Sequence, residues 1–324
     1  MLLPASATPD AGRLILARAL RGLGDGFVSI YLAAYLQGIG FSKIQIGAIV
    51  TSMLVGSAVL TLLVGLASHR ISARRVLFFA AVLMCATGAG FATLTSFWLL
   101  FFVAFVGTLN PSAGDVSVFL PTEQAILAGE VSAVDRTALF ARYSLGGSLF
   151  GAFGALMSGL PEAAAHRFGW DLTEAFRLGF VFYGVLALFI IALYRTMQHG
   201  RTPVPALKER TPLRKSRSIV IRLTALFAMD SFGGGFAIDS LVVLWLFLRF
   251  DLSLQIVGAV FFGARILTAL SQLISPRLAA RFGLIETMVF THLPANAFLV
   301  LAAFMPTATL AVTFLLLRMA FSSM

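Results

Sequence analysis

The chain has 324 residues, of which 59% are hydrophobic and 12% are charged, a composition that excludes a soluble globular domain and predicts a membrane protein. The formal net charge is +10, but the basic residues gather in stretches between apolar runs, which argues against nucleic-acid binding. The single cysteine, Cys85, excludes an intrachain disulfide, and the sequence predicts no metal or other cofactor.

Ten apolar segments follow one another along the chain, each of roughly the length that a helix needs to cross a bilayer. A membrane-spanning β-barrel would instead show shorter segments with alternating polarity. The predicted fold class is therefore an all-α polytopic membrane protein. We expect the spans at residues 12–37, 43–68, 75–95, 97–121, 137–160, 174–196, 218–249, 254–276, 284–305 and 308–324.

Two basic stretches interrupt this pattern, one at residues 70–75 and a longer one between Arg195 and Arg222. Basic residues concentrate in cytoplasmic loops, so we expect a multi-pass protein of the cell (inner) membrane with its N-terminus and both basic stretches in the cytoplasm. Six spans precede the longer stretch and four follow it. The sequence thus predicts an N-terminal six-helix bundle at 1–196, a basic cytoplasmic linker at 197–217 and an incomplete C-terminal bundle at 218–324.

An internal repeat supports the division into two bundles. A shift of 211 residues brings "SKIQIGAIV" (42–50) onto "SLQIVGAVF" (253–261), and it also aligns Arg70 with Arg281. Parallel six-span halves are a known architecture of membrane transporters. Because the shift leaves the fifth and sixth spans without a second copy, one to two further spans are expected and the chain is expected to be truncated at its C-terminus.

The basic stretch between the second and third spans reads "GLASHRISARR" (65–75) and resembles a loop motif of the major facilitator superfamily of secondary transporters. Gly65, Arg70 and Arg74 match that motif, whereas His69 stands in the place of its usual aspartate. The corresponding segment of the second half, "PRLAARFG", keeps Arg281. By this resemblance Gly65, Arg70, Arg74 and Arg281 belong to gating loops.

The resemblance implies a two-bundle fold with a central cavity lined by spans one, four, seven and ten. It places Asp25, Asn110, Asp239 and Arg318 around that cavity. It also implies transport of a small-molecule solute by alternating access, with binding sites that face one side of the membrane and then the other.

Asp25 interrupts the first apolar span about twelve residues from its start, which corresponds to a depth of about 18 Å. An ionisable residue near the bilayer midplane is costly and usually functional, so Asp25 is predicted to be a protonatable cavity residue. The alternative is a structural carboxylate that neutralises Arg18 or Arg21, one to two turns away.

The seventh span contains two acids, Asp230 and Asp239, which lie on opposite faces of a straight helix. The glycine run at 233–235 permits a break between them. The 211-residue shift favours Asp239 as the counterpart of Asp25, and a second alignment, on the Gly-Phe pairs, favours Asp230. Both stay candidates.

Several other residues stand out in the spans or next to them. Arg265 and Arg318 lie too deep for their side chains to reach the membrane surface, so each needs a partner or a substrate. Pro111 follows Asn110 and is expected to open the hydrogen-bond ladder of the fourth span. Asp115 and Glu123, near the cytoplasmic end of the fourth span and in the loop after it, are expected to pair with Arg136 or Arg142.

The predicted function is secondary active transport of a small solute, with a proton or another ion as coupling partner and the lipid bilayer as solvent. No phosphate-binding Gly-rich loop is present to use ATP, and no catalytic constellation indicates an enzyme. The alternative is a non-transporting membrane sensor or assembly protein with the same fold.

Overall fold

The computed structural model describes residues 4, 6–67, 70–112, 117–198, 217–234 and 238–322. Their regular elements are helices: α1 Pro9–Gly38, α2 Lys43–Ala67, α3 Ala73–Thr93, α4 Phe97–Val106, α5 Phe119–Leu127, η1 Ala133–Asp135, α6 Arg136–Met157, α7 Leu160–Phe168, α8 Leu172–Thr196, α9 Arg217–Gly234, α10 Asp239–Phe250, α11 Leu254–Phe282, α12 Leu284–Phe304 and α13 Ala308–Ser322. Among the described residues, five helical segments, in α2, α3, α8, α11 and α12, are long and apolar enough to cross a membrane. The all-α polytopic fold is confirmed.

Two of the predicted spans are discontinuous helices. The expected span 97–121 is divided into α4 and α5, and the expected span 218–249 into α9 and α10. The first break contains Pro111, which lacks a backbone N–H and disfavours the helical conformation of the residue before it. The second begins at Gly234, the end of α9, where glycine lowers the cost of leaving the helix.

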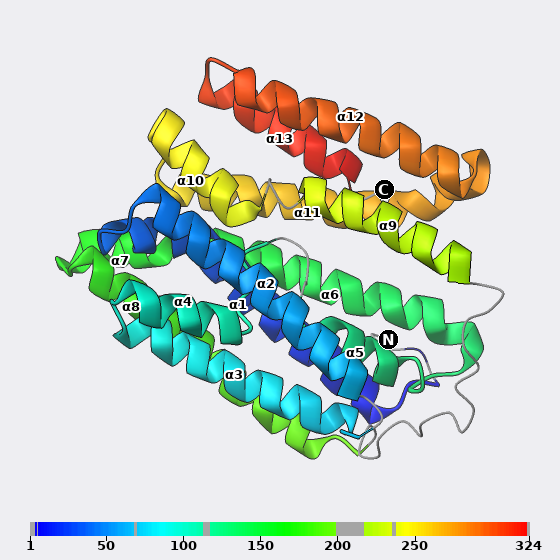
Figure 1. Ribbon diagram of the computed structural model, residues 1–324. Coiled ribbons are helices and arrows are strands. Elements are labelled where there is room, and N and C mark those ends of the chain that lie inside the picture. The colour runs from blue at the N-terminus through cyan, green and yellow to red at the C-terminus, as the bar shows by residue number, and fades with distance from the viewer. Residues whose placement is uncertain are drawn as a thin grey trace.

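The helices form two groups in Figure 1, the N-terminal helices α1–α8 below and the C-terminal helices α9–α13 above. Within the first group α1 packs against α6 and α8, α3 packs against α8, and α2 packs against α4. The helices α1 and α6 pack closely because glycines of one helix lie against the backbone of the other. A Cβ added to Gly26 of α1, for example, would overlap the carbonyl group of Gly151 of α6. This approach brings the middle of α1 directly onto α6.

The two groups touch through α10 against α1 and through α11 against α6. A Cβ on Gly258 of α11 would lie 2.6 Å from the Ala155 carbonyl oxygen, and the Phe153 and Phe262 rings are 5.9 Å apart. We call the end of the molecule where α8 finishes and α9 begins the linker end, and the opposite end the distal end. These α6–α11 contacts lie toward the distal end.

Candidate functional site

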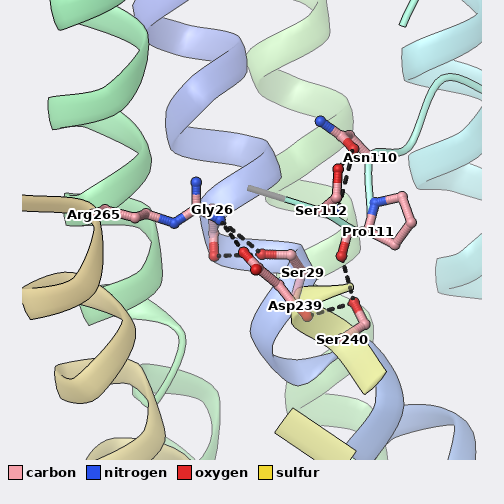
Figure 2. A network of polar contacts seen from close by, with 8 residues as sticks. All are labelled: Gly26, Ser29, Asn110, Pro111, Ser112, Asp239, Ser240 and Arg265. Atoms are coloured by element: carbon pink, nitrogen blue, oxygen red, sulfur yellow. Dashed lines mark hydrogen bonds and ion pairs between the residues drawn. The ribbon is translucent and has the colours of Figure 1, made fainter. Parts of the chain in front are cut away.

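The two helix breaks meet at the centre of the molecule. The Ser240 amide, in the first turn of α10, donates to the Pro111 carbonyl oxygen at 3.2 Å. The Ser240 hydroxyl donates to the Ser29 carbonyl oxygen of α1 at 2.7 Å and lies 3.2 Å from the Pro111 carbonyl oxygen. Figure 2 shows Ser240 between these two segments. The first turn of α10 thus donates hydrogen bonds to backbone carbonyl oxygens in the N-terminal half of the chain.

A buried ion pair lies beside this junction. Arg265 of α11 donates from Nη2 to Oδ2 of Asp239 at 2.9 Å, and the same nitrogen is 3.4 Å from the Ser29 hydroxyl (Figure 2). The guanidinium lies over α6 at Gly151, where an added Cβ would come within 3.1 Å of Nη1. Arg265 therefore joins α10 and α11 to α1 and α6. We call Ser29, Pro111, Asp239, Ser240 and Arg265 the central network.

Two further predicted residues lie near the central network. Asn110, which is buried, accepts hydrogen bonds from the Ser112 amide at 3.2 Å and the Ser112 hydroxyl at 2.9 Å. Arg318 of α13 is half-buried and interacts electrostatically with Asp239. The structure therefore brings Asn110, Asp239, Arg265 and Arg318 into one region, as a shared site requires.

Of the two acids in the seventh span, Asp239 lies in the central network. Asp230 lies in α9, but its side chain is outside the part of the chain that the structure describes. The structure therefore describes the contacts of Asp239 alone, and both acids stay candidates.

Asp25 is buried near the middle of α1, one turn from Ser29. The Tyr183 hydroxyl of α8 lies 3.4 Å from its Oδ1 atom and 3.5 Å from the Thr108 carbonyl oxygen. Asp25 thus has a neutral hydroxyl donor on one side, and Thr108 belongs to the break in the fourth span. The carboxylate therefore lies beside the central network.

Glu123 of α5 belongs to a second buried cluster, which corrects its expected pairing with Arg136 or Arg142. It forms an ion pair with Arg21 and accepts hydrogen bonds from the hydroxyls of Tyr143 and Tyr194, the latter at 2.5 Å. The Arg21 guanidinium also lies 4.3 Å from the centre of the Phe119 ring. The break before α5 allows that short helix to pack against α1, α3 and α6, which turns Glu123 toward Arg21.

The predicted gating residues are spread over the linker end. Arg74 of α3 donates to the Tyr194 carbonyl oxygen at 2.9 Å and to that of Arg195, so it caps the end of α8. Arg70 is exposed, Gly65 lies in the last turn of α2, and the Arg281 guanidinium is 5.3 Å from the Phe282 ring centre. His69, Asp115 and residues 199–216 are outside the described residues.

Sequence reasoning missed Ser29 and Ser240, although the repeat contained a signal for them. Ser240 is separated from Ser29 by 211 residues, the shift that aligns the two halves, and the two residues are hydrogen-bonded. In a parallel repeat the halves are related by an axis along the membrane normal. A residue that touches its own counterpart must lie near that axis, so this hydrogen bond puts the pair at the centre, a position that the 211-residue pairing by itself leaves open.

Discontinuous apolar helices that meet at a buried polar network define a polytopic membrane protein of the transporter type. The family model of the Major Facilitator Superfamily matches residues 14–324, and the chain belongs to this superfamily. An uncharacterized membrane protein of Saccharomyces cerevisiae is 23% identical over 315 residues, which cover 87% of this chain and 70% of the yeast protein.

Solved structures share the fold at low sequence identity. A mutant of the nucleoside transporter NupG has a TM-score of 0.68 and 16% identity, and the match covers 97% of this chain and 79% of the other. A bacterial homologue of the human lysosomal transporter Spinster, in an inward-facing and unoccupied conformation, also has a TM-score of 0.68 and 16% identity. The match covers 98% of this chain and 74% of the homologue. A D-xylose–proton symporter has a TM-score of 0.65 and 16% identity, and the match covers 96% of this chain and 80% of the symporter.

Proposed function

We propose that this protein is a secondary active transporter that moves a small solute across the membrane by alternating access. The observation that carries the proposal is the central network, which joins the N-terminal and C-terminal helices at the breaks of two spans. Transporters bind substrate near the midplane between two repeats, where broken helices present backbone groups and polar side chains. The division into bundles at 1–196 and 218–324 is part of this proposal.

The contacts between the two groups indicate which end is closed. From Ser29, Gly151 and Arg265 at mid-depth, they continue to Gly159 and Gln255 near the distal end. The α9 side chains that the structure describes are exposed, and those of residues 220, 223, 227 and 230–234 lie outside the described part. We infer a conformation that is closed at the distal end and accessible from the linker end, the same type of state as the inward-facing Spinster homologue.

The basic linker puts the linker end, and with it the N-terminus, on the cytoplasmic side of the cell (inner) membrane. This assignment stays a prediction from the charge pattern. Labelling by a membrane-impermeant thiol reagent, with one cysteine at Ser96 and another at Thr202, would check it, because only the first should react in intact cells.

We propose a proton as the coupling ion and Asp25 as the residue that carries it. A buried carboxylate beside apolar surroundings prefers its neutral form, and access of water favours the charged form. The Tyr183 hydroxyl, 3.4 Å from Asp25, can donate to the charged carboxylate and accept from the protonated one, so it suits a group that changes its protonation. The D-xylose–proton symporter is a protein of the same fold that uses this ion.

Solute uptake by the purified protein in proteoliposomes tests the proposed function. With an imposed pH gradient and a panel of labelled metabolites, a transporter accumulates at least one solute in a saturable manner, and a protonophore collapses the accumulation. Binding of a solute without flux would instead support a sensor or assembly protein and contradict the proposal.

A further inference from the structure

Resting on the proposed function, we further propose that the transported solute carries an anionic oxygen group, a carboxylate or a phosphate, and that Arg318 binds this group. The inference deepens the assignment of the central site, because it names the charge class of the substrate.

Arg318 is the observation from which the inference starts. It lies ten residues after the start of α13, a depth of about 15 Å into an apolar helix. In the described part of the chain it makes no hydrogen bond and no ion pair, and its one electrostatic interaction is with Asp239. A cation at such depth is costly unless it has a partner or faces an aqueous cavity. Arg318 is half-buried, so it is not sealed off by the packing of the described helices.

Asp239 cannot fully serve as that partner. Its carboxylate is already bound by Arg265 at 2.9 Å, and Arg318 reaches it only through a longer-range electrostatic interaction. The N-terminus of α10, which begins at Asp239, adds a further positive partial charge at the same place. Arg265, Arg318 and Asp239, counted by themselves, carry one net positive charge.

Two other acids that the structure describes near this depth contact N-terminal helices. Glu123 is bound by Arg21 and two tyrosine hydroxyls, and Asp25 lies against the Tyr183 hydroxyl of α8. An anionic group that enters from the linker end would supply the charge that Arg318 lacks.

The chemistry of arginine sets the ligand class. A guanidinium offers parallel N–H donors that match the two oxygens of a carboxylate or a phosphate, and such charge-assisted bonds are about twice as strong as neutral ones. A neutral sugar or nucleoside would leave the excess charge uncompensated, and a cationic solute would be repelled by it. An anion is the class that the site favours.

Thermal unfolding of the purified protein, followed at constant ionic strength, tests the inference with defined probes. The anionic probes are lactate, succinate and glycerol 3-phosphate, and the others are glucose, uridine and choline. We expect at least one anion to raise the unfolding temperature, and glucose, uridine and choline to leave it unchanged. The carboxylate and phosphate arms show which oxygen group is preferred.

Substitutions connect this binding to Arg318. The Arg318→Gln variant should weaken the affinity for the stabilising anion by about tenfold or more, because a charge-assisted hydrogen bond is lost. The Arg318→Lys variant should keep part of the affinity. The control Arg249→Gln, which removes an exposed arginine at the end of α10, should bind as the wild type does.

The unliganded variants distinguish ligand binding from a structural role. Since Arg318 lacks an ion-pair partner, Arg318→Gln without ligand should unfold at the wild-type temperature or above it. A lower unfolding temperature of the unliganded variant would overturn the inference. It would also be overturned if Arg318→Gln left the affinity for the anion unchanged, or if none of the anionic probes stabilised the wild-type protein. Uptake of neutral solutes alone would refute this inference and support the proposed function. Anion binding through Arg318 without any flux would support this inference and contradict the proposed function.

Discussion

Replacement of Asp25 by asparagine should abolish uphill accumulation driven by a pH gradient and leave solute binding intact. A transporter that moves one proton with each solute can concentrate it about tenfold for each pH unit of gradient, because tenfold corresponds to 1.4 kcal/mol. The asparagine side chain keeps the size and removes the titration, so the accumulation ratio should fall to about 1 while exchange across the membrane persists. The measurement is uptake and counterflow in proteoliposomes.

The control for this variant is Asp251→Asn, which changes an exposed carboxylate at the end of α10 and should leave accumulation unchanged. If Asp25 instead serves only to neutralise Arg18, Asp25→Asn should fold poorly, and removal of Arg18 as well should restore stability and transport together. Wild-type accumulation by Asp25→Asn would show that another group carries the proton.

Loss of the Glu123 charge should strongly destabilise the N-terminal helices. Glu123→Gln leaves the Arg21 guanidinium buried without its ion-pair partner, and breaking a buried pair costs about 3–5 kcal/mol. The variant should unfold in detergent at a much lower temperature or denaturant concentration than the wild type. The double change Arg21→Met with Glu123→Gln should regain most of that loss, because the uncompensated charge is gone.

The matched control is Glu174→Gln, which breaks the exposed Arg177–Glu174 pair on α8, where the Glu174 side chain is 62% accessible. An exposed pair contributes about 0–1 kcal/mol, so this change should barely alter stability. Equal effects of the two substitutions would contradict the structural role that we assign to Glu123.

Much of the fold could be predicted from the sequence because each span must be long and apolar. The limits of α2, α3, α8 and α12 follow the predicted spans closely, since polar residues stop each helix at the membrane surface. Pro111 and the glycine run marked the interrupted spans because both act on the backbone itself. The short helix α7 was not predicted, because nine residues are too few to register as an apolar span.

The partners of the buried charges were harder to predict. Asp239 and Arg265 could each be recognised by their depth, but no spacing in the sequence says that α10 and α11 turn them toward each other. Glu123 was assigned the wrong arginine because its direction depends on how α5 packs after the break. A serine such as Ser240 carries no signal of its own, since serines are common in membrane helices and its role comes from the junction it occupies.

Reversible locking of the distal end tests alternating access most directly. A Cβ added to Gly159 would lie 3.0 Å from Cα of Gln255, so cysteines at these two positions, in a Cys85→Ala background, are close enough to form a disulfide between α11 and the residue preceding α7. The measurement is solute flux in proteoliposomes before and after oxidation and again after reduction, with each single-cysteine variant as control. We expect oxidation to stop flux in the double variant alone and reduction to restore it, whereas undiminished flux through the fully cross-linked protein would contradict a mechanism that opens the distal end.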